Sequence, residues 1–319
     1  MTASHPRSAP PRRVVAGIVQ AEVAPPREAV ERTIELARAA AERGAQLIAF
    51  PETWIPGYPI WLDVCRDAGL WNHPPVKRVF ARMAEHSVEV PGPATETIAR
   101  TAREIAATIV VGVIERTSQG AGRGTLYNSL LVFDADGRLV NHHRKLMPTY
   151  TERMVWGAGD AAGLRACDTT AGRVGGLICW EHWMPLARQA LHESGEDIHV
   201  AAWPNVSEMH QVASRHYAFE GRCFVLAAGS LIRASALPDE LEPHPSRVPA
   251  ADAWLLRGGS AIIGPDGGYL AGPLYDEPGI VVAELEMERI REESMTLDVT
   301  GHYHRPELFT FGVHHGSRL

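Results

Sequence analysis

Cys179 stands where an apolar stretch ends and a run of aromatic and charged residues begins. The segment 177–187 reads LICWEHWMPLA, so the cysteine is followed by Trp180, Glu181 and His182 and then by a helical pattern that starts at a proline. A cysteine that ends an apolar strand is usually a small core side chain. The carboxyl end of a strand is also where α/β sheets place their ligand sites. A thiol with an ordinary pKa of about 8.5 needs a neighbouring base or cation to react well near neutral pH.

Glu52 follows another apolar run, in the segment AFPETWIPGYP (49–59). The residues after it include two prolines, a glycine and the aromatic side chains Trp54 and Tyr58. A glutamate in such a loop is more often simply solvated. A carboxylate directly after an apolar strand and walled by aromatic rings, however, has the surroundings that raise a pKa and favour a general base.

Lys145 and Glu152 lie seven residues apart in the segment HHRKLMPTYTERMVWGAGD (142–160). A basic run on a strand is usually a solvated face. A lysine and a glutamate that enter a site together can instead neutralise each other and both stay charged. The pair is therefore a second source of charge for the cysteine.

These three segments together closely resemble the nitrilase superfamily of carbon–nitrogen hydrolases. The resemblance is carried by FPE around Glu52, HRKLMPTYTER around Lys145 and Glu152, and LICWEHWMP around Cys179, in the order that the family has. The segments WGAGD, DIHVAAWP and GHYHRPELF extend it over nearly the whole chain. One departure is local: the family often continues the tryptophan–glycine pair with GDG, and this chain has Ala161–Ala162–Gly163 after the aspartate.

The resemblance implies a fold, a reaction and a role for each residue. The fold is α/β, a four-layer α-β-β-α sandwich with two mixed sheets and the helices outside. Glu52 is the general base, Cys179 the nucleophile that attacks a nitrile carbon, and Lys145 the group that stabilises the tetrahedral species. Glu152 orients Lys145 and the substrate or water. The products are a carboxylic acid and ammonia, formed through thioimidate and thioester intermediates. Separately from the resemblance, the aromatic-rich loop after Glu52 favours an aryl or arylaliphatic nitrile over an aliphatic one.

Two other functions remain open at this point. The sequence C-W-E-H resembles true nitrilases and the related cyanide-degrading enzymes, whereas a thiol amidase or carbamoylase of the same fold usually carries other residues after the cysteine. A catalytically silent assembly or binding protein is a more remote alternative, and the intact set of four residues argues against it.

The substrate pocket is expected close to these residues, and no cofactor or metal is expected. We predict that substrate is bound by residues in the loops after the strand ends: Trp54, Tyr58, Trp180, Glu181, His182 and Asn205. For His182, the alternative is that it shapes the loop after Cys179 from behind. The chain has 15 histidines, but none stands in an H-E-x-x-H context and no cysteine pair has zinc-ligand spacing.

The remaining pattern alternates strands with helices, as in an α/β protein. Strands are predicted at 14–19, 46–50, 109–116, 126–146, 173–180, 197–203 and 223–230, with a hairpin turn at Asp136–Gly137. Helices are predicted from about 30 to 41, from 93 to 109, over 185–195 and over 209–221. A second hairpin covers 261–272, and residues 280–293 run from strand into helix.

Composition limits which binding partners and which cellular compartment we expect. Lysine and arginine number 31 against 38 acidic residues, a net charge of −7, so nucleic acid and anionic membranes are not expected partners. No apolar stretch approaches the roughly 20 residues of a membrane span, the N-terminus has no secretion signal, and four unpaired cysteines suit a reducing compartment, so a cytoplasmic location is expected.

We expect a flexible tail over 1–12 and one catalytic domain over 13–319. The resemblance implies a homodimer or a larger, even spiral, homo-oligomer, with residues from about 290 to 319 contributing to subunit contacts.

Overall fold

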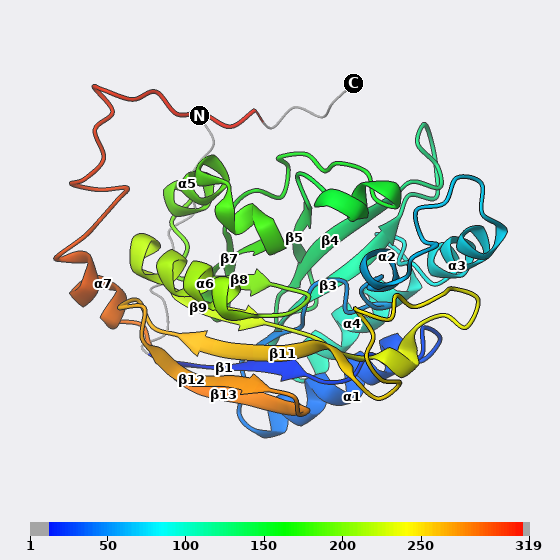
Figure 1. Ribbon diagram of the computed structural model, residues 1–319. Coiled ribbons are helices and arrows are strands. Elements are labelled where there is room, and N and C mark those ends of the chain that lie inside the picture. The colour runs from blue at the N-terminus through cyan, green and yellow to red at the C-terminus, as the bar shows by residue number, and fades with distance from the viewer. Residues whose placement is uncertain (1–12, 315–319) are drawn as a thin grey trace.

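Two β-sheets packed face to face form the centre of the molecule (Figure 1). The structure, a computed structural model, describes residues 13–314. The first sheet has the strand order β13-β1-β2-β3-β4-β5, and β1, β2 and β3 run parallel. Its strands are β1 (Arg13–Gln20), β2 (Leu47–Ala49), β3 (Thr108–Arg116), β4 (Leu126–Phe133), β5 (Leu139–Arg144) and β13 (Gly279–Glu286).

The second sheet has the order β10-β11-β9-β8-β7-β6, with β12 paired to β11. Its centre, β7 to β9, is parallel and its flanks are antiparallel, so both sheets are mixed. Its strands are β6 (Cys167–Thr169), β7 (Gly172–Ile178), β8 (Ile198–Ala202), β9 (Phe224–Ala228), β10 (Leu231–Arg233), β11 (Trp254–Ile263) and β12 (Tyr269–Tyr275).

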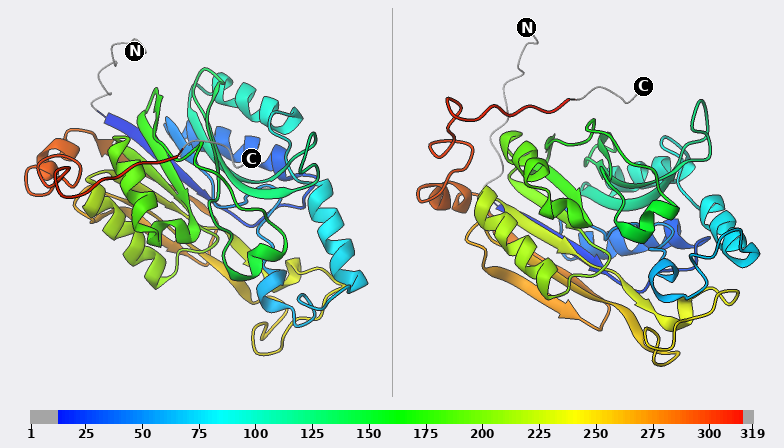
Figure 2. Two further views of the ribbon diagram at one scale, coloured as in Figure 1. Left: turned by 90° about the horizontal axis from the view of Figure 1, so that it is seen from above. Right: turned by 45° about the horizontal axis from the view of Figure 1, so that its top comes forward.

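Helices cover the outer faces of the two sheets, which completes four layers (Figure 2). Helices α1 (Ala29–Glu42) and α4 (Pro93–Glu104) pack on the first sheet, and α5 (Pro185–Glu193) and α6 (Glu208–Gly221) cover the second. The shorter elements are α2 (Trp61–Val64), α3 (Pro74–Glu85), α7 (Arg289–Ser294) and the 3₁₀ helices η1 (Tyr150–Met154), η2 (Cys179–Trp183) and η3 (Ala234–Ala236). The expected α-β-β-α sandwich is confirmed. None of the helices within residues 13–314 is long and apolar enough to cross a membrane.

Strand β3 shows how the sequence builds the layers. Successive side chains of a strand point to opposite faces, and Ile109, Val111 and Val113 join the core under α1 and α4. Val110 points the other way, into the core between the sheets, which it shares with Leu177 of β7. Burying each such side chain stabilises the sandwich by roughly 1.5–3 kcal/mol, so a strand apolar on both faces belongs inside such a fold.

Most predicted elements are confirmed, with ends that differ by a few residues. The range 126–146 is the hairpin of β4 and β5, which turns at Asp136–Gly137, and 261–272 lies within the hairpin of β11 and β12. The sequence analysis missed α3, although Val76, Val79, Phe80 and Met83 recur at helical spacing and pack against the core. The predicted tail 1–12 and the end of the predicted contact segment, 315–319, lie outside the described residues.

Candidate active site

Three strand ends from both sheets bring the predicted residues together. Glu52 follows β2 and Lys145 follows β5 in the first sheet, and Cys179 follows β7 in the second. Gly112 of β3 makes room for the Glu52 segment, because a Cβ there would lie 2.3 Å from the Pro51 carbonyl oxygen. The site therefore lies between the sheets, at the edge where these strands end.

Lys145 lies between two carboxylates. Its Nζ is 2.9 Å from Glu52 Oε1 and 2.7 Å from Glu152 Oε2, and all three side chains are buried. Burial opposes the charge of an ammonium group, but the negative charges of ionised Cys179 and of the two carboxylates outweigh it and raise the pKa of Lys145. Lys145 is therefore a fixed positive charge buried between the two carboxylates.

Glu52 has one oxygen paired and one free. Asn128 donates a 2.6 Å hydrogen bond to the same Oε1 that Lys145 contacts, whereas Oε2 is buried with no hydrogen-bond partner among the described residues. Burial raises the pKa of Glu52 to about 7, with Lys145 lowering it and Glu152 raising it. A carboxylate poised near neutrality with an unpaired oxygen is suited to accept a proton.

Glu152 is held by three donors. Besides Lys145, it accepts hydrogen bonds from the Thr149 backbone N–H at 2.7 Å and from the Tyr58 hydroxyl at 3.0 Å. Because both oxygens are occupied, Glu152 is fitted to hold Lys145 in place.

Cys179 faces this group from the second sheet. Its Sγ and one oxygen from each of Glu52 and Glu152 lie within 4.8 Å of one another. Burial and the Glu52 charge raise the pKa of the thiol well above its usual range, while Lys145 and the backbone N–H of Trp180 lower it. The resting group is thus a thiol, which needs a base to become a nucleophile.

Glu181 and His182 fix the turn in which Cys179 lies. Cys179 has φ of 54°, a left-handed conformation that costs energy for any residue but glycine. Glu181 accepts the Ile178 N–H at 2.7 Å, and the His182 ring nitrogen Nδ1 lies 2.7 Å from the Cys179 carbonyl oxygen. The polar residues after the cysteine therefore hold the peptide groups on both sides of it.

A cavity of about 850 Å³ opens above Cys179. Of the predicted substrate-binding residues, Tyr58, Trp180, Glu181 and Asn205 line it. The other two are corrections. Trp54 is buried beside Phe50 with its Nε1 donating to Thr33, and His182 is buried behind the Cys179 turn, so neither side chain is on the cavity wall.

Sequence reasoning missed several residues on the cavity wall, among them Met147, Trp183, Met184 and His210. Trp183 could have been found, because it lies four residues after Cys179 in the same short helix. His210 could not, since it reaches the cavity from α6, and no local pattern marks it.

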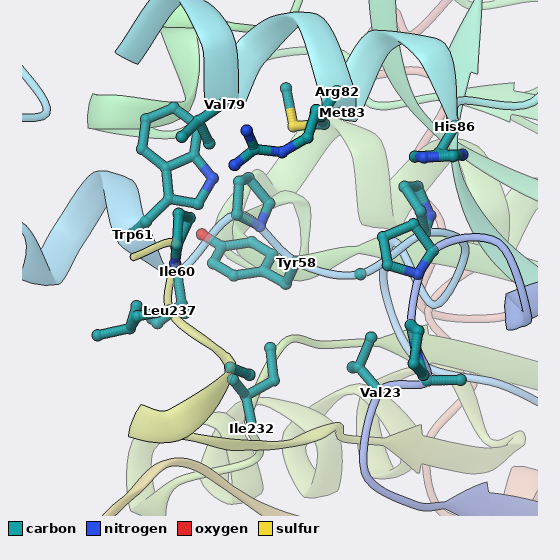
Figure 3. Close-up of a pocket in the computed structure, with 18 of the residues that line it drawn as sticks. Val23, Tyr58, Ile60, Trp61, Val79, Arg82, Met83, His86, Ile232 and Leu237 are labelled. Atoms are coloured by element: carbon teal, nitrogen blue, oxygen red, sulfur yellow. The ribbon is translucent and has the colours of Figure 1, made fainter. Parts of the chain in front are cut away.

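Figure 3 shows a second cavity, of about 630 Å³. Tyr58 and Ile60 line both cavities. Its other walls are largely apolar and include Val79 and Met83 of α3 and Leu237. Tyr58 therefore lies between the two cavities. Its hydroxyl donates a hydrogen bond to Glu152, and its ring faces the second, largely apolar cavity.

The donor atoms of Glu52, Glu152 and Cys179 are close enough together to suggest a metal site. Lys145, however, already bonds both carboxylates and supplies a positive charge between them. The arrangement is better described as a base, a cation and a thiol than as a set of metal ligands.

Comparison with known proteins identifies the family. The family model described as carbon-nitrogen hydrolase matches residues 15–293. A nitrilase of Paraburkholderia phymatum is 41% identical over 285 residues, which cover 86% of this chain and 78% of that protein. An aliphatic nitrilase of Sinorhizobium fredii is 38% identical over 300 residues, covering 93% and 94%.

A solved structure shares the fold at low identity. The carbon–nitrogen hydrolase of Helicobacter pylori G27 superposes with a TM-score of 0.70 at 19% identity, over 93% of this chain and 97% of that one. Two mixed sheets with outer helices, the buried Glu–Lys–Cys arrangement between them and a family match over most of the sequence agree with one another. The chain belongs to the carbon–nitrogen hydrolase family, in the nitrilase superfamily.

Proposed function

We propose that this protein is a nitrilase that hydrolyses an organic nitrile to a carboxylic acid and ammonia. The observation that carries the proposal is the unpaired, buried oxygen of Glu52 beside the Cys179 thiol, with Lys145 fixed next to both. The names of the relatives and the sequence C-W-E-H support nitriles, rather than amides, as substrates.

The first half of the reaction makes a covalent adduct. Glu52 takes the proton of the Cys179 thiol, and the sulfur attacks the nitrile carbon to give a thioimidate, whose nitrogen receives a proton. Splitting one difficult hydrolysis into two covalent steps lowers each barrier. Lys145 and the Trp180 backbone N–H stabilise the charge that develops at the reacting centre.

The second half consumes two water molecules. One adds to the thioimidate carbon, the C–N bond breaks and ammonia leaves, so a thioester remains on Cys179. The second water cleaves the C–S bond, which releases the carboxylic acid and returns the proton to the thiol. Glu152 keeps Lys145 in position throughout, because two further hydrogen bonds fix its own carboxylate.

We propose an aryl or arylaliphatic nitrile as the substrate. The cavity wall offers the rings of Tyr58, Trp180 and Trp183, with Trp180 and Trp183 packed edge to face at 5.3 Å. Such a wall favours a flat apolar group. Shape differences in an apolar pocket are worth only about 1–3 kcal/mol per methylene, so aliphatic nitriles are expected to react more slowly rather than not at all.

The test is ammonia release from a panel of nitriles, each run beside its amide. The panel contains phenylacetonitrile, benzonitrile, a dinitrile, an aliphatic nitrile and cyanide, and Cys179→Ala is the blank. We expect the wild type, but not the blank, to release ammonia from the aryl nitriles. We also expect mass spectrometry to find a thioester adduct on Cys179. Release from amides alone would contradict the proposal and favour an amidase, and release from cyanide alone would favour a cyanide-degrading enzyme.

We further propose a homo-oligomer that works in the cytoplasm. Exposed apolar side chains lie on α5 and α6 and in the segment after α7: Leu186, Met209, Val212, Phe219, Tyr303, Leu308 and Phe309. Contiguous exposed apolar surface commonly marks contacts between proteins. The four cysteines are free and buried, which suits a reducing compartment. Light scattering after size exclusion measures the assembly, and a monomer would contradict it.

A further inference from the structure

A chain of buried side chains runs away from Cys179 into the second sheet, on the side opposite the cavity. His182 Nε2 lies 3.0 Å from His199 Nε2, and His199 Nδ1 lies 2.8 Å from Glu196 Oε2. With the 2.7 Å contact from His182 Nδ1 to the Cys179 carbonyl oxygen, three links join the nucleophile to a buried carboxylate. The mechanism proposed above uses none of these three side chains.

Counting hydrogens fixes the charge of this chain. The Cys179 carbonyl oxygen only accepts, so His182 Nδ1 must carry a hydrogen. The two facing Nε2 atoms need one hydrogen between them, and the link to Glu196 needs a third. Burial acts against ionised Glu196, but its histidine partners outweigh this and lower the pKa of Glu196 to about 2. With Glu196 ionised, the two rings hold three hydrogens and share one positive charge.

We propose that His182 and His199 share a proton and that Glu196 balances the resulting positive charge. This group positions the Cys179 backbone, and the positive end of the buried ion pair faces the thiol. His182 is the positioning residue, because its N–H holds the left-handed turn of Cys179. The ion pair lowers the free energy of the thiolate, since the positive charge is nearer to Cys179 than Glu196 is. This inference rests on the proposed function only in assigning Cys179 as the nucleophile.

The surroundings are built to keep the chain in place. Gly175 of β7 leaves room for Glu196, because a Cβ there would lie 2.2 Å from Glu196 Oε2. The Tyr217 hydroxyl donates to the other oxygen of Glu196, and its ring stacks on His199 with centroids 3.8 Å apart. The ring of Trp203 stacks on His182 at 4.5 Å.

Other titratable groups surround the pair and bear on its pH response. They are His192 and Arg188 on α5, His210, Tyr217 and Glu220 on α6, and Glu196 before β8. Burial, helped by the charge of His199, lowers the pKa of His182. His192 lies 3.4 Å from Glu196 and is a second partner for that carboxylate.

The first experiment measures the reactivity of Cys179 without any nitrile. The second-order rate of alkylation by iodoacetamide is followed from pH 6 to 9 in the wild type and in Glu196→Gln, with the labelled cysteine identified by mass spectrometry. Removing the Glu196 charge lets the pair lose its extra proton, so we expect alkylation about tenfold slower and a profile moved to higher pH by about one unit. An unchanged profile in a folded variant overturns the proposal.

The control removes an equal charge nearby. Glu220→Gln takes a carboxylate from Arg188 and His192 but leaves the links among His182, His199 and Glu196 intact. We expect its alkylation profile to match the wild type within about twofold. A shift as large as that of Glu196→Gln would mean that general charge, rather than the pair, sets the reactivity.

A variant pair separates positioning from charge. His182→Phe removes the donor to the Cys179 carbonyl, whereas His182→Asn keeps an amide N–H that can reach it but cannot hold the shared proton. We expect His182→Asn to have a thermal stability and a KM close to those of the wild type, unlike His182→Phe. Its kcat should still be lowered, and its alkylation profile should still lie at higher pH than that of the wild type. Full recovery of the profile with Asn would overturn the charge part of the proposal.

Neutron diffraction of deuterated wild-type crystals tests the hydrogen count without a variant that must fold. Deuterium is expected on His182 Nδ1, on His199 Nδ1 and once between the two Nε2 atoms. Absence of deuterium from His182 Nδ1 overturns the proposal. Because neither this measurement nor alkylation needs substrate, the inference can fail while nitrile hydrolysis is confirmed, and the reverse outcome is equally distinguishable.

Discussion

Two buried glutamates of the first sheet contact neighbouring cations and end with opposite properties. Glu115 of β3 contacts Arg144, and Glu52 contacts Lys145, the next residue along the chain. Both carboxylates are almost inaccessible to solvent. The pKa of Glu115 is lowered to about 2, because Arg144, His142 and Ser129 outweigh the effect of burial, whereas burial raises the pKa of Glu52 to about 7.

The difference lies in how the two carboxylates are paired. Both oxygens of Glu115 are hydrogen-bonded, and its partners Arg144 and His142 are partly exposed. Glu52 has an oxygen with no hydrogen-bond partner within residues 13–314, and its cation is shared with Glu152. A fully paired carboxylate stabilises the fold, whereas an incompletely paired one keeps the capacity to accept a proton.

The largest expected effect comes from Glu52→Gln. The amide keeps the shape and the contact with the first sheet but cannot accept the thiol proton, so kcat should fall by about 10³-fold or more. The measurement is steady-state ammonia release from the best nitrile of the panel. Activity within tenfold of the wild type would show that Glu52 is not the base.

Lys145→Arg tests the cation of the same group. Arginine keeps the charge but spreads it over a planar fork that does not fit the space between Glu52 and Glu152. We expect kcat to fall by about 10²-fold, the usual cost of losing one well-placed stabilising donor. A variant as active as the wild type would show that charge alone suffices there.

The contributions of Glu52 and Glu115 to stability change with pH in opposite directions. The pKa of Glu52 is raised, so its ionised form costs stability: its contribution is full below about pH 4.5 and is lost as the pH rises through about 7. In the proposed mechanism ionised Glu52 is also the base, so kcat/KM should fall about tenfold per pH unit below about 7. A profile flat from pH 5 to 7 would contradict this assignment.

The smallest effect on activity is expected from Glu115→Gln, which should change kcat by less than threefold. The pKa of Glu115 is lowered, so its stabilisation is present above about pH 4.5 and lost as the pH falls toward 2. The variant should lose about 2–3 kcal/mol of unfolding free energy at pH 7 and less at pH 3. Urea denaturation at both pH values measures this, and an equal loss at both would be inconsistent with it.

The sequence predicts which side chains gather between the sheets, because they stand at strand ends and in recognisable segments. Glu52, Lys145, Glu152 and Cys179 are brought together as expected. Asn128 was missed, because it lies within β4 and reaches Glu52 only through the pairing of the first sheet. A partner supplied by strand register leaves no local signal in the sequence.

The errors at Trp54 and His182 have the same physical origin. Both side chains lie near the reacting groups along the chain, but each finds a buried hydrogen-bond partner in another element, Thr33 of α1 and His199 of β8. A polar atom that leaves water needs such a partner. Proximity in sequence therefore predicted the neighbourhood correctly and the direction of the side chain wrongly.

The pairing of β1 with β13 has a consequence for protein synthesis. Residues 13–20 pair with residues 279–286, so among the described strands the first to be synthesised waits for the last. All four reacting groups emerge long before that partner does. A nascent chain shorter than about 279 residues therefore exposes the outer edge of β1, and such an edge is a template for pairing with another chain. Translation that stalls late yields a product at risk of aggregation, although every residue of the proposed active site has already been made.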